Sequence, residues 1–165
     1  IGNRAICRPL AERSGIPFHY VEMDGERREN GFLEIRDLLL KQNVELVVLA
    51  RFMQILPDAF CREFAGKIIN IHHSFLPAFI GANPYKQAHE RGVKLIGATC
   101  HYVTADLDAG PIIEQEVERV SHFHSPSDLS RLGRQCERIA LAKGIRYHVH
   151  DRTLIDGHRA IVFPD

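Results

Sequence analysis

The sequence predicts a single α/β domain with a mostly parallel sheet and helices on its faces. Helical and extended patterns alternate along the 165 residues, which is typical of this fold class. The run VELVVLA, residues 44–50, is almost entirely apolar, as expected of a parallel strand covered on both faces. A second apolar run, residues 67–71, ends in polar side chains. In such sheets ligands bind outside the carboxyl ends of the strands, so a site is expected there.

The first third of the chain predicts two helices. Residues 5–14 form a short helix ended by Gly15, and the extended stretch PFHYVEM follows at residues 17–23. Residues 26–42 carry apolar side chains at helical spacing, which predicts a surface helix with one face packed inward. The side chains of that face are Phe32, Ile35, Leu38 and Leu39. A further short helix is expected over residues 57–64, with Pro57 in its first turn.

The remaining chain predicts two strands, a long helix and a hairpin. Residues 93–103 and 111–120 are strand-like, and the loop TADLDAG joins them; one antiparallel strand is expected near the end of the sheet. Residues 127–148 have helical spacing, although Gly133 and Gly144 weaken the helix propensity. The tail RTLIDGHRAIVF reads as a hairpin around its DG turn.

Composition limits the partners that the chain can have. Lys plus Arg and Asp plus Glu both number 21, so the formal charge is +0 and predicts no binding to nucleic acid or to an anionic membrane. No apolar run approaches the roughly 20 residues that span a bilayer, so we expect a cytoplasmic protein. Four dispersed cysteines without a CxxC pair favour reduced, mostly buried thiols. Because the first residue is Ile1, we expect the N-terminal part of the domain to lie outside this sequence.

The stretch INIHHSF, residues 69–75, places hydrogen-bonding side chains where a buried strand ends. Side chains alternate between the faces of a strand, so Asn70 and His72 should project to one side, and Ile71 and His73 to the other. An amide and an imidazole both donate hydrogen bonds to an oxygen that gains negative charge during attack on a carbonyl. Asn70 and His72 are therefore candidates for holding a carbonyl oxygen, while structural turn and cap roles remain the alternative.

Asp108, in the loop DLDAGP, is the candidate for proton transfer. The small residues Ala109 and Gly110 would let the backbone approach a ligand, and Pro111 would stiffen the exit from the loop. Asp108 could orient His72 and accept a proton from an attacking water or amine. A turn carboxylate is the structural alternative, and spacing does not separate Asp108 from Asp106.

The other histidines do not predict a metal site. His122 and His124, and likewise His148 and His150, are two residues apart, and no Cys or carboxylate partners have the spacing of metal ligands. We interpret them as surface residues. Metal-dependent hydrolysis through these pairs is the weaker hypothesis.

Three stretches of the chain resemble the folate-dependent formyltransferase family, and within it the formyltetrahydrofolate deformylases. They are LARFMQILPDAF, GKIINIHHSFLPAF and GATCHYVTADLDAGPIIEQ, and the similarity extends over nearly the whole chain. The resemblance implies a Rossmann-like formyltransferase fold and hydrolysis of 10-formyltetrahydrofolate, the substrate, to tetrahydrofolate and formate, without a further cofactor. The family's catalytic Asn, His and Asp fall on Asn70, His72 and Asp108 through the motifs NIH and LDxGP.

The resemblance also implies a folate site. The family binds its folate near the segment that here contains Met53, Gln54, Ile55 and Leu56. Met53, Ile55 and Leu56 would form apolar walls, and backbone groups beyond Leu56 and around Ala105, Asp106 and Asp108 would bind the pterin. His101 would help to position Asp108 or a water.

Two alternatives within this resemblance stay open. Glycinamide ribonucleotide transformylase shares the fold and the three catalytic residues, but His73 and Gln54 stand where that relative usually has Pro and Arg, as in the deformylases. A folate-binding fragment without turnover is the second alternative. Ile80 and Asn83 depart from the Pro and Lys that are typical of the family, and no ACT-like regulatory segment is recognisable. The resemblance further implies a role in one-carbon metabolism and purine biosynthesis and a homo-oligomer.

Overall fold

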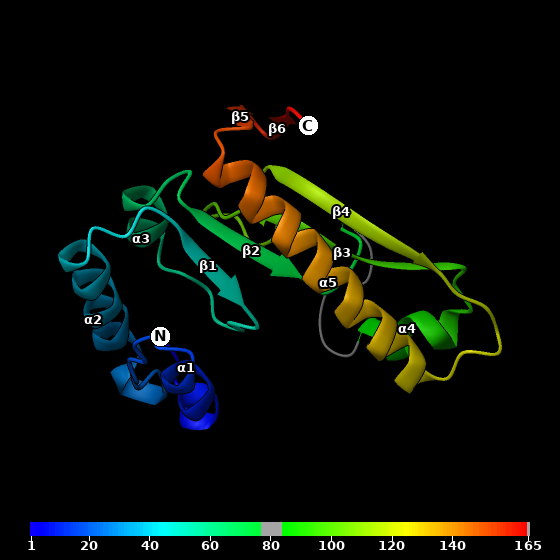
Figure 1. The fold of residues 1–165 in the computed structure, drawn as a ribbon, viewed down its shortest axis with the longest axis horizontal. Coiled ribbons are helices and arrows are strands. Elements are labelled where there is room, and N and C mark those ends of the chain that lie inside the picture. Colours follow the sequence, from blue (N-terminus) through cyan, green and yellow to red (C-terminus); the bar gives the residue numbers. More distant parts are fainter. Residues whose placement is uncertain (77–83, 165) are drawn as a thin grey trace. The chain divides into compact units, whose positions relative to one another are not determined.

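The computed structural model describes residues 1–76 and 84–164 and divides into two compact units, Ile1–Glu45 and Leu46–Asp165. Figure 1 shows the helices and strands of both units in chain order. Ile80 and Asn83, which depart from the family pattern, lie outside the described residues.

The first unit contains the two predicted helices. A 3₁₀ turn, Ala5–Cys7, leads into α1, Arg8–Arg13, and a second turn, Gly25–Arg27, leads into α2, Arg28–Lys41. The predicted inward face of α2 is confirmed for three of its four side chains, because Phe32, Ile35 and Leu39 are buried and Leu38 is half-buried. The extended stretch 17–23 makes one isolated bridge, Gly2 with Tyr20, in place of a strand.

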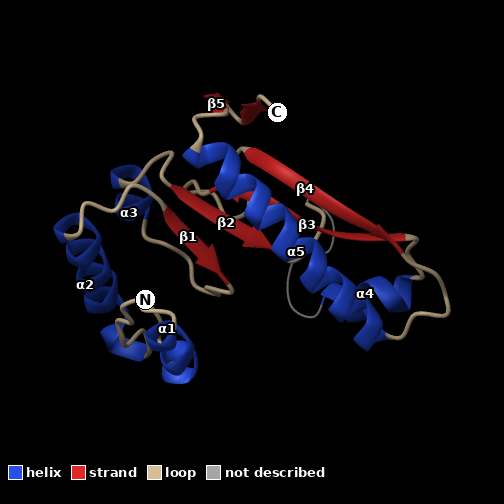
Figure 2. Cartoon of the chain, in the orientation of Figure 1, coloured by secondary structure: helices blue, strands red, loops and turns tan. Residues whose placement is uncertain are grey.

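The second unit is built on a mixed sheet with the order β1-β2-β3-β4 (Figure 2). Its strands are β1, Val47–Ala50; β2, Ile68–His72; β3, Leu95–Tyr102; and β4, Ile112–Arg119. β1 and β2 are parallel, with α3, Asp58–Glu63, between them in the chain, whereas β2–β3 and β3–β4 are antiparallel. The α/β class is confirmed, but the sheet is mixed where a mostly parallel one was expected. Residues 103–111 between β3 and β4 are too few for a parallel crossover, which needs a dozen or more residues.

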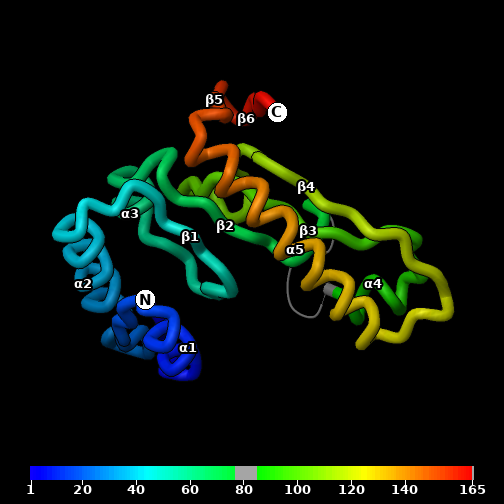
Figure 3. The backbone as a smooth tube through the Cα atoms, viewed as in Figure 1, coloured from blue at the N-terminus to red at the C-terminus, as the bar shows by residue number. Residues whose placement is uncertain are grey.

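The long predicted helix is confirmed as α5, Pro126–Val149, and it lies along the sheet (Figures 1 and 3). A capping box fixes its start: Asp128 N–H donates to Ser125 Oγ, and Ser125 N–H donates to the Asp128 carboxylate. Ala140 of this helix packs into a core with Ile69, Cys100 and Ile113 from three strands. One face of the sheet is therefore closed by apolar packing.

The two glycines that weaken the helix pattern of α5 allow close packing. A Cβ atom at Gly133 would overlap the ring of Tyr85, and one at Gly144 would overlap Cys100 Sγ in β3. Tyr85 belongs to α4, Pro84–Arg91, a helix that the sequence analysis did not predict, and its hydroxyl donates to Glu137 of α5 at 2.9 Å. The low helix propensity of glycine is thus offset by the approach of α5 to α4 and to the sheet.

Two further predictions concern the edges of the second unit. β1 is less covered than its apolar sequence suggests, because its residues alternate between half-buried and exposed, and Val48 is 38% exposed. The C-terminal hairpin is confirmed as β5, Thr153–Asp156, paired antiparallel with β6, Arg159–Val162.

The Gly144→Ala variant tests whether close packing or helix propensity dominates at this position, because the two predict opposite changes in the free energy of unfolding. Propensity alone would stabilise the helix by about 1 kcal/mol. Overlap with Cys100 Sγ predicts instead a loss of about 1–3 kcal/mol in the free energy of unfolding. Urea denaturation of the wild type, Gly144→Ala, Cys100→Ala and the double variant should show that Cys100→Ala relieves most of the loss. A stabilised Gly144→Ala variant would contradict the packing described here.

Candidate active site

The sheet face opposite α5 carries the polar residues of β2 and β3. Ile69 and Ile71 pack in the core against α5, so alternation places Asn70 and His72 on the other face. The β2–β3 register sets Asn70 opposite His101 and His72 opposite Thr99. His72, Thr99 and His101 are all buried. A row of buried polar side chains therefore crosses two neighbouring strands.

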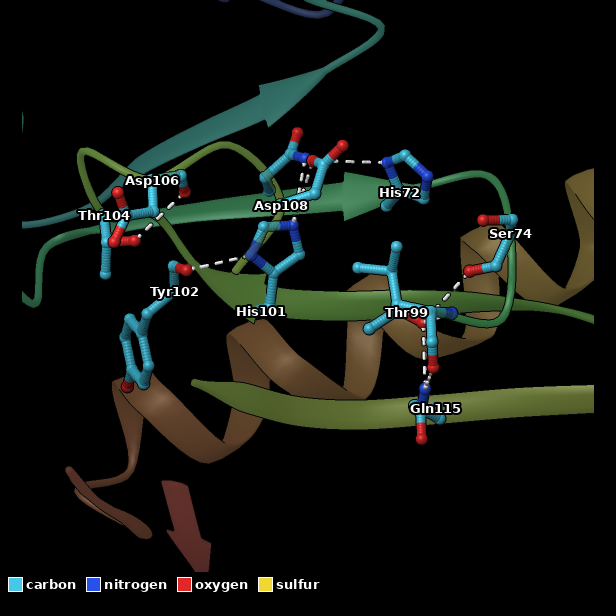
Figure 4. Close-up of polar contacts among 11 residues, drawn as sticks. His72, Ser74, Thr99, His101, Tyr102, Thr104, Asp106, Asp108 and Gln115 are labelled. Atoms are coloured by element: carbon cyan, nitrogen blue, oxygen red, sulfur yellow. Dashed lines mark hydrogen bonds and ion pairs between the residues drawn. The ribbon is translucent and has the colours of Figure 1, made fainter. Parts of the chain in front are cut away.

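Asp108 contacts this row from the β3–β4 loop. Its Oδ1 lies 3.3 Å from His72 Nδ1 and 3.8 Å from His101 Nε2 (Figure 4). Its backbone adopts the left-handed region, with φ of 54°, which is uncommon outside glycine and typical of strained functional positions. Asp106, the competing carboxylate, lies on an exposed stretch of the same loop. The structure thus separates two residues that sequence spacing left equivalent.

The His72–Asp108 contact fixes which nitrogen of His72 carries the proton. Burial lowers the pKa of His72 below its ordinary value of 6.5, and the Asp108 carboxylate opposes that effect only in part. The ring is therefore neutral at pH 7, and the nearby carboxylate favours a proton on Nδ1, which donates toward Oδ1. Nε2 keeps its lone pair, is buried and has no hydrogen-bond partner among the described residues. Resting His72 is therefore an acceptor at Nε2, whereas the sequence analysis expected it to donate to a carbonyl oxygen.

His101 holds the side chain of Asn70. Its Nδ1 lies 2.9 Å from the Tyr102 carbonyl, which can only accept, so the proton sits on Nδ1. Burial lowers the pKa of His101 as well, so Nε2 is a bare acceptor, and Asn70 Nδ2 donates to it at 3.2 Å. This bond assigns the amide orientation of Asn70. One N–H of the amide bonds to His101, and the other is left for a ligand.

Gly110 lets the loop that carries Asp108 pack against β3, which is not the role that the sequence predicted for it. We expected the small residues after Asp108 to let the backbone approach a ligand. In the structure a Cβ at Gly110 would instead overlap the Tyr102 carbonyl, the group that fixes the tautomer of His101. Gly110 therefore allows the loop to close against β3.

The segment proposed for folate leaves β1 at the same sheet edge as His72. β1 and β2 are parallel, with Ala50 paired to Ile71, so both carboxyl ends lie side by side. Arg51 and Met53 both have a φ of 53°, a costly conformation for residues of this size. Met53 and Ile55 are exposed, Gln54 is half-buried and Leu56 is buried. Leu56 thus belongs to the core, and Met53 and Ile55 present the accessible apolar surface.

The structure brings together Asn70, His72, His101 and Asp108, which the sequence predicted, and it adds a hydrogen-bond network of Ser74, Leu76, Thr99 and Gln115, to which the sequence assigned no role. Thr99 Oγ1 donates to the Ser74 carbonyl and accepts from Leu76 N–H, both at 3.0 Å. Gln115 Nε2 donates to Thr99 Oγ1 at 3.0 Å and to the Leu76 carbonyl at 3.2 Å. Thr99 stands as a polar residue among the small and apolar residues of β3, but Gln115 has Glu114 and Glu116 as neighbours in β4, so the sequence does not single it out.

Two other expectations concern metals and membranes. Within residues 1–76 and 84–164, no group of three or more His, Cys, Asp and Glu side chains is placed to hold a metal ion. Over the same residues, no helix has the length and apolar character needed to cross a bilayer. The four cysteines are free thiols, and all but Cys7 are buried.

Stability should fall in acid because buried histidines must be protonated. His148 was expected at the surface, but it is half-buried and its Nδ1 lies 2.8 Å from the Tyr102 hydroxyl. Burial lowers the pKa values of His72, His101 and His148 below 6.5 in the folded state, so between those values and 6.5 the unfolded chain binds more protons. The contribution of these neutral histidines to the free energy of unfolding is thus expected to be complete above about pH 6.5 and to be lost as the pH falls below that value. Urea denaturation between pH 5 and pH 8 measures this, with His148→Gln reducing the dependence and the exposed His122→Gln as the control. A stability that rises toward pH 5 would contradict the assignment.

Comparison with known proteins identifies the family. The chain matches the formyl transferase family over residues 2–145. It is 52% identical over 163 residues to a formyltetrahydrofolate deformylase of Bacillus subtilis, and 46% identical over 162 residues to one of Escherichia coli. These alignments cover 99% and 98% of this chain but 54% and 58% of the relatives, so the chain spans about half of their length.

Solved structures agree with this match. A formyltetrahydrofolate deformylase from Pseudomonas syringae superimposes with a TM-score of 0.94 at 52% identity, over 98% of this chain and 54% of that one. A phosphoribosylglycinamide formyltransferase from Anaplasma phagocytophilum superimposes with a TM-score of 0.87 at 36% identity, over 99% of this chain and 79% of that one. The predicted formyltransferase fold is confirmed, and the chain belongs to the formyl transferase family.

Proposed function

We propose that this chain carries the catalytic residues for hydrolysis of 10-formyltetrahydrofolate to tetrahydrofolate and formate. The observation that carries the proposal is the convergence of Asn70, His72 and Asp108 at the end of β2, in a chain similar to formyltetrahydrofolate deformylases. These residues provide a hydrogen-bond donor and a proton acceptor for a carbonyl addition. The proposed reaction needs no cofactor besides the folate that carries the formyl group.

Asn70 is proposed to polarise the formyl group. Its second N–H is free to donate to the formyl oxygen, because the bond to His101 occupies the first and holds the amide in place. When water attacks, that oxygen gains negative charge and the hydrogen bond strengthens. Asn70 therefore stabilises the tetrahedral intermediate more than the bound substrate.

The His72–Asp108 pair is proposed to take up the proton that the attacking water loses. The two side chains are about one-tenth exposed and in contact, so the added proton belongs to the pair and not to one residue. Once the pair has accepted it, the imidazolium presents an N–H at Nε2 and becomes a second donor to the oxygens of the intermediate. The pair can then return a proton to N10 of the folate as the C–N bond breaks.

Folate binding is proposed for the strained segment after β1. The exposed side chains of Met53 and Ile55 supply apolar contacts, and the half-buried Gln54 supplies a polar one. Backbone groups at Ala105 and Asp106 lie in the loop that delivers Asp108 and are proposed to bind the pterin. The homo-oligomer expected from the resemblance remains a prediction.

A second candidate is formyl transfer to an amine acceptor, favoured by the similarity to the Anaplasma phagocytophilum formyltransferase. The same three residues would serve an amine nucleophile, because it also loses a proton as it attacks. The two functions differ in their requirement for an acceptor. The hydrolase releases formate with water alone, whereas the transferase needs an amine such as glycinamide ribonucleotide.

Asp108→Asn is expected to remain folded and to lose about 10²- to 10³-fold in formate release, because an amide cannot store the proton of the pair. Asn70→Ala should lose a similar factor through its oxyanion contact. Asp151→Asn is the matched control, since it makes the same change at an exposed residue whose backbone φ is also 54°. Formate release from 10-formyltetrahydrofolate measures all three.

Glycinamide ribonucleotide in a parallel reaction separates the two candidate functions. Formate release that is independent of the acceptor supports the hydrolase. Formyl transfer that requires the acceptor supports the transferase. An Asp108→Asn variant with near-normal turnover, or an Asp151→Asn variant as impaired as Asp108→Asn, would contradict the assigned roles.

A further inference from the structure

Two buried polar side-chain atoms lack a hydrogen-bond partner among the described residues, and they lie two residues apart. They are His72 Nε2 and Ser74 Oγ. Ser74 is 4% exposed. Buried polar atoms without a partner are rare, because each costs about 1–3 kcal/mol, so two of them next to the proposed site indicate a ligand.

The unpaired hydroxyl of Ser74 does not come from a loosely held segment. The Ser74 carbonyl accepts from Thr99 Oγ1, and both backbone groups of Leu76 are bonded to Thr99 and Gln115. Thr99 Oγ1 itself uses its proton and accepts two further bonds. The network therefore fixes the backbone on both sides of Phe75, and the Ser74 hydroxyl is held there without a hydrogen-bond partner among residues 1–76 and 84–164.

The chemistry of the two atoms selects the kind of ligand. Figure 4 shows the Ser74 hydroxyl pointing toward His72 while its carbonyl points toward Thr99. His72 Nε2 carries a lone pair, because Asp108 keeps the proton on Nδ1, so its resting partner must be a donor. A formyl oxygen cannot donate, but a water can donate to Nε2 and accept from the Ser74 hydroxyl.

We propose that Ser74 is a further catalytic residue, whose hydroxyl together with His72 Nε2 holds the attacking water. This inference rests on the proposed hydrolysis. In the step, the water oxygen forms a bond to the formyl carbon, and its proton passes to Nε2. The formyl π electrons move to the oxygen held by Asn70. When the intermediate collapses, the pair on that oxygen re-forms the C=O bond and the C–N10 bonding pair goes to nitrogen, which takes up the proton held by His72 and Asp108.

Ser74→Ala should lower kcat for formate release by about 10-fold, because one hydrogen bond to the water is lost. The KM for 10-formyltetrahydrofolate should change less than about 2-fold, since Ser74 is proposed to contact the water and not the folate. Ser130→Ala, a half-buried serine of α5, is the matched control and should behave as wild type. A thermal melt of each variant shows whether it is folded.

Two further variants keep the proposal testable if Ser74→Ala does not fold. Ser74→Cys preserves the size of the side chain but weakens its hydrogen bonds, so kcat should fall at least about 3-fold. Thr99→Val removes the hydrogen bond to the Ser74 carbonyl and should also lower kcat. Thr99→Ser keeps the hydroxyl, so its kcat should stay near that of the wild type.

The outcomes separate this inference from the proposed function. If wild type releases no formate, the proposed hydrolysis is wrong. If wild type releases formate and a folded Ser74→Ala or Ser74→Cys variant keeps its kcat, the role of Ser74 is wrong. If Ser74→Ala instead raises KM by the factor expected for kcat and leaves kcat unchanged, Ser74 belongs to folate binding and the proposal is overturned.

Discussion

The contact between His72 Nδ1 and Asp108 Oδ1 sets which nitrogen of His72 carries the proton, and the proposed chemistry depends on that choice. It brings together a strand end and a loop that are distant in the sequence, and it is possible because β2 and β3 pair in one register. That register places His72 beside Thr99 and Asn70 beside His101 on the face that α5 leaves free. A one-residue slip of β2 against β3 would turn Asn70 and His72 toward the core, away from Thr99 and His101.

In each of the two histidines of the site, a neighbouring group that can only accept hydrogen bonds determines which ring nitrogen carries the proton. The Tyr102 carbonyl places the proton of His101 on Nδ1, which leaves Nε2 to orient Asn70. The Asp108 carboxylate places the proton of His72 on Nδ1, which leaves Nε2 as the base. Burial keeps both rings neutral by lowering their pKa values. The chemistry of the site therefore depends on backbone and loop groups that never need to touch the substrate.

The sequence predicted most elements of the fold, because they depend on local apolar patterns and turns. It did not predict the direction of β3, which depends on how the chain returns to the sheet after residues 73–94. Asn70, His72 and Asp108 were recognisable as motifs, but spacing could not separate Asp108 from Asp106, since only the left-handed backbone of Asp108 and its burial distinguish them. Thr99 and Gln115 were missed because their partners include backbone groups of Ser74 and Leu76, and such pairs leave no pattern in a sequence.

The central claim is that Asp108 keeps neutral His72 protonated on Nδ1 and unprotonated on Nε2. Nitrogen NMR of the imidazole groups tests it most directly, with the His72 signals assigned through a His72→Asn variant. We expect a neutral ring at pH 7.5 with the proton on Nδ1, and loss of that preference in Asp108→Asn. A neutral ring with its proton on Nε2, unchanged in Asp108→Asn, would contradict it.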